Sequence, residues 1–359
     1  MKLKSLLLAS GAAVVAVSGA RAADAVIIPE PEPVEYVRVC DAAGTGYFYI
    51  PGTETCLQIS GEVIYKIGFR NTPSQEPVII RDDDGNIIGE NDGVQNGWEK
   101  EYEISLDFNT WRDTEYGDLT TSIQLGASDS TIGAATESVL VDAGVAVNEA
   151  FITLGGLTIG YTDSFYPGGL GASDLDAEGP DTGIIGYTVD FGNGSFGIAL
   201  EDDGNVDWIP AIVGVVSAEF GDVSVAAAAV YDDTDDFWGA QVHLAYSAGP
   251  LTVDASAQYS DGSTPPFPGL GASAYSADYE WVLGLGMDYD VNSQLTVFAG
   301  LDYGIDQFGT AGNDDFLVEV GADYELVDGF TVGFQADFST VITGSFDFED
   351  AEITFTRSF

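Results

Sequence analysis

Basic residues are scarce in this chain, which has 10 Lys and Arg against 59 Asp and Glu and a single His. This balance argues against nucleic acid as a partner, because phosphate recognition depends on Lys and Arg. The sequence shows no catalytic constellation either. Acid–base catalysis needs a positioned partner group, and the lone His243 is interpreted as a solvated polar residue. We therefore predict a protein that is not an enzyme and uses no cofactor.

Long apolar runs are also missing beyond the first 22 residues, where no stretch of 18 apolar residues occurs. A transmembrane helix is therefore not expected. Nevertheless 45% of the residues are hydrophobic and 12% are aromatic, so the chain is able to cover a large apolar surface. A membrane protein without spanning helices has one remaining option, which is a closed β-barrel. The 45 glycines, 17 tyrosines and 20 phenylalanines fit that option.

The N-terminus has the three parts of an export signal in order. Lys2 and Lys4 give a positive start, residues 6–17 are apolar, and Ala20-Arg21-Ala22 is a small-x-small cleavage site. Residues 1–22 are predicted to be a signal peptide, which leaves Ala23 at the mature N-terminus. The mature chain then has seven basic and 59 acidic residues and a formal charge of −52.

Cysteine is limited to Cys40 and Cys56. An exported chain meets an oxidising compartment, so we expect a structural disulfide between them. It closes a short loop and contributes roughly 3 kcal/mol on the loop-entropy model. Residues 23–56 are predicted to be an N-terminal linker, rich in Pro and Glu at 24–35, followed by a small disulfide-closed module.

Alternation of apolar and polar residues begins at Leu57 and recurs to the end of the chain. In the first segment, Ile59, Val63 and Tyr65 share one face, whereas Glu62 and Lys66 share the other. Strands with one apolar and one polar face are what a water-filled barrel needs. Residues 57–359 are therefore predicted to form a transmembrane antiparallel β-barrel of the all-β class.

Short turns alternate with long polar loops along the barrel region. The expected strands are 57–70, 98–110, 117–128, 148–154, 157–163, 182–191, 195–202, 209–220, 223–231, 237–248, 251–260, 280–291, 294–304, 315–327, 329–339 and 347–359. Sixteen strands leave an aqueous channel, with the short turns periplasmic and the long loops extracellular. Fourteen or eighteen strands remain open at this point. A soluble β-sandwich is disfavoured, because aromatic residues gather near turns and strand ends, as in membrane-interface belts.

Four stretches resemble the general porin family of α-proteobacteria, of the Rhizobium/Brucella type. They are the leader KSLLLASGAAVVAVSGARAADA, the segment at 35–61 with EYVRVCDAAGTGYFYIPGTETCLQISG, the hairpin AFITLGGLTIGYTDSF at 150–165, and the ending ITFTRSF at Phe359. The resemblance implies a sixteen-stranded barrel in the outer membrane, a homotrimer, and a third long loop, at about 164–181, folded into the lumen. It also implies that Phe359 is read by the barrel-assembly machinery.

The predicted pore lining is strongly acidic. Porins of this kind set wall arginines against an acidic inserted loop, but here only two of the early wall positions are basic. The residues that we predict to line the pore are Glu62, Lys66, Arg70, Glu99, Glu101, Glu103, Asp107, Glu319 and Asp323 on the wall, and Asp174, Asp176, Glu178 and Asp181 on the inserted loop. Acidic rings between low-dielectric walls concentrate cations, so cation selectivity is expected.

Three functional interpretations stay open from the sequence. The first is a porin for passive diffusion of ions and small hydrophilic solutes, the second is a substrate-selective channel for cationic nutrients, and the third is a structural barrel that anchors the envelope without a useful pore. In each case the predicted partners include outer-membrane lipid and lipopolysaccharide. The acidic run at 81–86 is interpreted as a solvated loop, because its Gly and Glu spacing does not fit a calcium-binding loop. No metal site is therefore predicted.

Overall fold

The computed structural model describes residues 38–73, 78–81, 87–91, 94–132, 144–167, 179–203, 209–233, 236–261, 279–308, 314–340 and 347–359. The chain divides into two compact units, Met1–Arg38 and Val39–Phe359, and the fold given below is that of the second. None of the helices in the described ranges is long and apolar enough to cross a membrane. The predicted leader at 1–22 lies outside the described residues.

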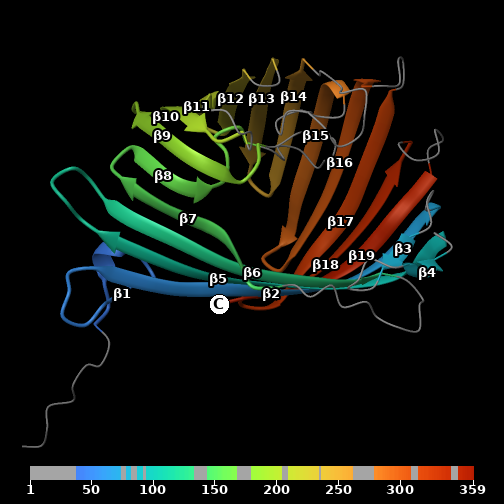
Figure 1. The fold of residues 1–359 in the computed structure, drawn as a ribbon, viewed down its shortest axis with the longest axis horizontal. Coiled ribbons are helices and arrows are strands. Elements are labelled where there is room, and N and C mark those ends of the chain that lie inside the picture. The colour runs from blue at the N-terminus through green and yellow to red at the C-terminus, as the bar shows by residue number, and fades with distance from the viewer. Residues whose placement is uncertain are drawn as a thin grey trace, which may run out of the picture. The chain divides into compact units, whose positions relative to one another are not determined.

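Sixteen strands of the second unit form one closed antiparallel barrel (Figure 1). They are β2 Cys56–Pro73, β5 Val94–Arg112, β6 Leu119–Ile132, β7 Ala146–Leu154, β8 Leu157–Thr162, β9 Thr182–Asp190, β10 Gly194–Glu201, β11 Ala211–Phe220, β12 Val223–Asp232, β13 Phe237–Ala248, β14 Leu251–Ser260, β15 Tyr279–Asn292, β16 Leu295–Gln307, β17 Asp315–Val327, β18 Phe330–Ser339 and β19 Asp347–Ser358. The last strand pairs with the first, Ile353 opposite Ile67, and this pairing closes the barrel. The predicted architecture and the strand count are both confirmed.

Three short strands lie outside the sixteen. β1, Phe48–Tyr49, pairs with the beginning of β2, and β3, Val78–Arg81, pairs with β4, Ile87–Asn91, as a separate hairpin. Figure 1 shows this hairpin at the opposite end of β2 from β1. The hairpin lies between the predicted strands 57–70 and 98–110, in a stretch expected to be a loop, because a short apolar run on each side of a polar turn carries little periodicity.

Side chains alternate between the two faces of the barrel wall, as the period of two requires. On β2, the outward residues Ile59, Val63 and Tyr65 are exposed, whereas Glu62 and Lys66 on the inward face are partly covered. On the outer wall, the ring centroid of Tyr259 lies 4.7 Å from that of Trp238 and 4.9 Å from that of Trp281. Such a row of amphipathic rings is typical of a membrane interface.

The inner face of β9 to β13 departs from the predicted polar character. It carries a buried apolar cluster that includes Ile184, Val213, Val230 and Phe237. Tyr166, from the third long loop, is buried in the same cluster. An apolar inner wall is stable here because it is covered by a protein segment and not by channel water. Alternation along one strand does not predict this, because the covering residue Tyr166 belongs to another segment of the chain.

The N-terminal module is held together at both of its ends. Cys40 and Cys56 form a disulfide with their Cα atoms 6.0 Å apart, which confirms the expected bridge. Within the module, Val39 forms a bridge with Phe48, and residues Asp41–Ala43 make a 3₁₀ turn. Arg112 Nη2 lies 2.9 Å from Glu54 Oε2, which links the module to the end of β5.

Candidate functional site in the barrel lumen

One face of β5 carries a column of carboxylates into the lumen. Glu99, Glu101 and Glu103 occupy alternate positions, so the strand period places their side chains on the same side. Lys66 stands opposite Glu101 in register on β2, and its Nζ lies 2.6 Å from Glu103 Oε1. The ammonium is therefore held by one carboxylate of the column, and two further carboxylates of that column flank the pair.

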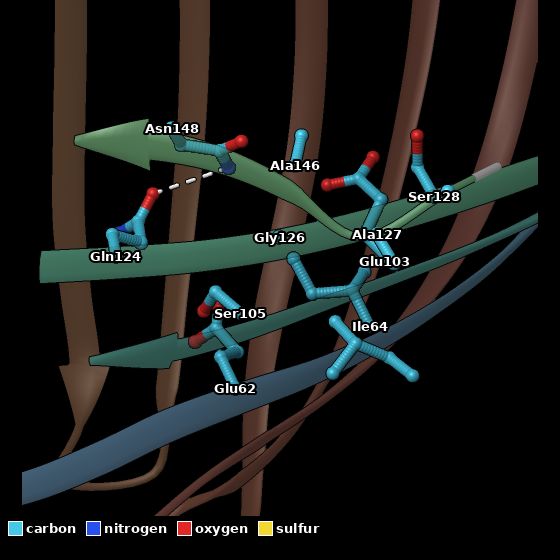
Figure 2. A pocket seen from close by; sticks show the side chains of 12 residues that line it. Glu62, Ile64, Glu103, Ser105, Gln124, Gly126, Ala127, Ser128, Ala146 and Asn148 are labelled. Carbon is cyan, nitrogen blue, oxygen red and sulfur yellow. Dashed lines mark hydrogen bonds between the residues drawn. The ribbon is translucent and has the colours of Figure 1, made fainter. Parts of the chain in front are cut away.

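A cavity of about 550 Å³ opens beside this column between β2, β5, β6 and β7. Figure 2 shows Glu62 and Glu103 on one side of it and Gln124 and Asn148 on the other. Asn148 Nδ2 donates to Gln124 Oε1 at 3.4 Å, and Gln124 Nε2 donates to Asp107 Oδ1 at 2.9 Å. Carboxylates backed by amides give a surface that hydrogen-bonds donors and attracts positive charge.

A second set of carboxylates lies on β17 and β18. Glu319 is opposite Asp337 in register, and Asp337 is in turn opposite Asp350 on β19. Gln335 Nε2 donates to Glu319 Oε2 at 2.7 Å and reaches Asp337 Oδ2 at 3.2 Å. The Gln335 amide of β18 therefore bridges a carboxylate of β17 and one of its own strand. Asp323 lies on the same inner face, one period-two step beyond Gly321.

The closing seam joins these two sets. Across it, Glu352 pairs with Gly68 and Thr354 pairs with Lys66. Toward the end of the strand, Ser358 Oγ donates to Glu62 Oε2 at 2.7 Å. We call the inner face of β17, β18, β19, β2 and β5 the acidic wall. It is continuous in space although its strands come from the two ends of the chain (Figure 1).

Several of the predicted pore-lining residues fall on this wall, and others do not. The wall contains Glu62, Lys66, Glu99, Glu101, Glu103, Asp107, Glu319 and Asp323. The backbone of Arg70 lies in β2 opposite Asp350. Asp181 is exposed immediately before β9, and Asp174, Asp176 and Glu178 lie outside the described residues. The prediction did not include Asp350 and Glu352, which alternation along the last strand would have given once its register was known.

His243 is placed differently from what the sequence suggested. It lies on the inner face of β13, opposite Ser256 of β14, and it is buried and not solvated. Its Nε2 lies 3.0 Å from Gln241 Oε1. The interpretation as a solvated residue was wrong: His243 is buried beside Gln241, whose own Nε2 donates to Pro167 O of the third long loop.

A closed barrel with a polar, acidic lumen wall and an apolar outer wall with aromatic rings defines an outer-membrane β-barrel channel. The family model of the porin subfamily matches residues 24–356. The porin Omp2b of Brucella suis biovar 1 is 35% identical over 92% of this chain and 91% of its own length. The chain therefore belongs to the porin subfamily and is a porin of the outer membrane.

Solved structures agree with the fold. The outer membrane channel DcaP of Acinetobacter baumannii superimposes with a TM-score of 0.60 at 15% identity, covering 87% of this chain and 99% of its own. A mutant of the Rh. blastica porin gives a TM-score of 0.56 at 15% identity, covering 84% of this chain and 100% of its own. At these identities the likeness supports the architecture of the barrel.

Proposed function

We propose that this porin forms a water-filled, cation-selective channel for passive diffusion of ions and small hydrophilic solutes. The observation that carries the proposal is the acidic wall, where carboxylates occupy the inner positions of five adjacent strands and the Lys66 ammonium is bound by Glu103. A lumen wall that carries charge of one sign, in a barrel of low dielectric constant, concentrates counter-ions in the lumen and repels co-ions.

Barrel size and screening set the limits of this selectivity. Sixteen strands leave a lumen wide enough for water and solutes. At about 0.15 M salt the Debye length is about 8 Å, so the wall acts on an ion only across part of such a pore. Selectivity is therefore expected to be strong in dilute salt, to weaken in concentrated salt, and to fall as the pH drops through the carboxylate range near 4.

A reversal potential in a KCl gradient across a planar bilayer tests the proposal. The purified protein is expected to give a potential of the sign that marks K⁺ as the more permeant ion, larger with dilute than with concentrated solutions. A potential near zero, or one of the opposite sign, in dilute salt contradicts cation selectivity. A protein that inserts and gives no conductance contradicts the channel itself.

We further propose a homotrimer in contact with outer-membrane lipid and lipopolysaccharide, assembled through recognition of the C-terminal residue. Phe359 supports the last point. Its backbone N–H donates to Gly61 O at 3.0 Å and its carbonyl accepts from Gly61 N at 3.1 Å, which fixes it across the closing seam. As a whole the residue is 62% exposed, which leaves part of it accessible on the barrel.

Substrate selectivity is a second candidate function, favoured by the cavity in Figure 2. A hollow of about 550 Å³ lined by Glu62, Glu103, Gln124 and Asn148 is large enough for a small solute that carries a positive charge and several hydrogen-bond donors. Saturation separates the two functions. A flux of a cationic solute that plateaus with concentration supports a binding channel, whereas a flux that rises linearly supports free diffusion.

A further inference from the structure

The base of the third long loop binds a buried carboxylate of the barrel wall. Glu201, at the end of β10, has no exposed surface. Its Oε2 accepts a hydrogen bond from Ser164 Oγ at 2.5 Å and its Oε1 accepts one from Phe165 N at 2.8 Å. Ser164 Oγ also accepts from Tyr166 N at 2.9 Å, which folds the loop base into a tight turn around the carboxylate. We call residues 164–167 the loop foot.

Inward-facing glycines on three different strands make room for the two rings of the loop foot. A Cβ atom at Gly186 of β9 would lie 2.7 Å from Phe165 Cζ, and one at Gly197 of β10 would lie 3.1 Å from Phe165 Cε2. A Cβ atom at Gly239 of β13 would lie 3.1 Å from Tyr166 Oη. Side chains at these positions would push the rings into the lumen.

Polar contacts hold the remainder of the loop foot to β13 and β14 and tie its two legs together. Gln241 Nε2 donates to Pro167 O, and Gln258 Nε2 donates to Tyr166 Oη at 3.3 Å. From the returning leg, Gly179 N donates to Tyr166 O at 3.0 Å. Four strands of the barrel wall therefore contribute to the seat of a segment only four residues long.

We propose that Glu201 is a positioning residue that keeps the loop foot on the wall and so sets the open cross-section of the pore. A buried carboxylate requires hydrogen-bond donors in place of water. Ser164 and Phe165 supply donors only while the foot is seated, so the charge of Glu201 selects the seated arrangement. The inference rests on the proposed channel function, since the cross-section is read through conductance.

Single-channel recordings of the full-length protein test the proposal with Glu201→Gln, Ser164→Ala and their double variant. Glu201→Gln removes the charge and one acceptor, and losing such a charge-assisted hydrogen bond is expected to raise the fraction of time spent outside the wild-type conductance level by on the order of tenfold. Ser164→Ala is expected to act in the same direction. The double variant is expected to show less than the product of the two effects, because both remove one contact.

Glu319→Gln is the matched control, since it removes a carboxylate from the lumen at a residue hydrogen-bonded to Gln335. Glu319→Gln is expected to reduce cation selectivity and to leave the conductance level steady. Glu201→Gln is expected to leave cation selectivity as it is and to make the conductance level unsteady. Conductance traces of Glu201→Gln and Ser164→Ala that both match the wild type overturn the proposal. A wild-type protein without conductance overturns the proposed function, and the two failures are therefore distinguishable.

Gly186→Ala provides a probe that leaves Glu201 intact and keeps the test decisive if Glu201→Gln does not assemble. Its Cβ would displace Phe165, so unsteady conductance is expected here as well. Gly214→Ala is the companion control, because a Cβ at Gly214 has no atom within 4 Å. Equal, steady traces from both glycine variants overturn the proposal.

Discussion

Lys66 shows at the residue scale how one side chain modulates a wall of opposite charge. Its ammonium is bound to Glu103 at 2.6 Å and faces Glu101 in register. Pairing with one carboxylate neutralises that carboxylate toward a passing ion and leaves the rest of the column negative. Lys100 provides a natural comparison, because it occurs on the neighbouring strand but on the opposite face, paired with the outward Ile67.

Lys66→Gln is expected to increase cation selectivity. Removing the positive charge releases the Glu103 carboxylate from its ion pair. A unit charge that acts across roughly one Debye length changes the energy of an ion by less than about 1 kcal/mol. The K⁺ to Cl⁻ permeability ratio is therefore expected to rise by about twofold. The reversal potential in dilute KCl measures this ratio. Lys100→Gln makes the same charge change outside the lumen and is expected to leave the ratio unaltered; an equal rise in both variants contradicts a local role for Lys66.

Asp314, just before β17, is a residue whose titration is tied to a specific contact. The hydroxyl of Tyr303 donates to its Oδ2 at 2.7 Å and Asp306 N donates to its Oδ1 at 3.1 Å. These hydrogen bonds favour the charged form and lower the pKa of Asp314 below its ordinary value. The contact is therefore fully present above the ordinary pKa near 4 and is lost only as the pH falls through the lowered pKa.

Tyr303→Phe is accordingly expected to raise the pKa of Asp314 toward its ordinary value. Carboxyl ¹³C chemical shifts recorded from pH 6 down to the acid limit follow this titration directly. Thr296→Val is a suitable control, because it removes a different hydroxyl of β16, one that donates to Asp290 on β15, and it is expected to leave the Asp314 curve unchanged. An unshifted curve in Tyr303→Phe contradicts the assigned cause.

At the scale of elements, the N-terminal module depends on few contacts besides its disulfide. β1 contains two residues, and the 3₁₀ turn contains three. Such short elements do not persist alone, because each fixes backbone for little hydrogen bonding in return. In contrast, β2 is paired on both sides, with β5 and with β19, and does not depend on the module for its place.

Cys40→Ser with Cys56→Ser is therefore expected to loosen residues 40–56 while the barrel still forms. The loss of roughly 3 kcal/mol predicted by the loop-entropy model falls on the module. Limited proteolysis is expected to cleave the variant between these positions and to leave the wild type intact. A variant barrel that fails to assemble without the bridge contradicts a purely local role. In the native protein, intact and reduced mass spectra check both the bridge and the predicted start at Ala23.

At the scale of the whole molecule, barrel closure determines where the charge acts. Carboxylates that are far apart in sequence, such as Glu103 and Glu319, come to share one wall because β19 pairs with β2. The apolar cluster and the loop foot occupy a different stretch of the inner surface, on β9 to β14. The lumen therefore has an acidic side and a side where the loop base is fastened.

The proposed trimer is the prediction that belongs to this scale. We expect a species of three chains that resists mild detergent and dissociates on heating, measured by native mass spectrometry and by electrophoresis of unheated samples. Treatment with reductant serves as a control, since the disulfide lies within one chain and its loss is expected to leave the trimer intact. A monomer under mild conditions contradicts the proposal.

Period-two alternation and turn chemistry predicted sixteen strands as the preferred count, and the two cysteines of an exported chain predicted the disulfide. Each strand needs only its own pattern and flanking Gly, Asn, Asp or Pro to be recognised, so these features are local. The inward positions of Glu99, Glu101 and Glu103 follow from the same rule. The export signal and the acidic pore stay predictions of the same kind, because they depend on the composition and order of residues along the chain.

Only the tertiary structure decided which of those residues meet. The pairing of Lys66 with Glu103, the bridge from Gln335 to Glu319, and the burial of His243 all join residues whose neighbours are set by register and closure. The seat of the loop foot on Glu201 joins positions 36 and 37 residues apart and depends on glycines from separate strands. Local pattern determined which face each side chain takes, whereas the closed sheet determined its partners, because partner choice depends on contacts that no short stretch of sequence contains.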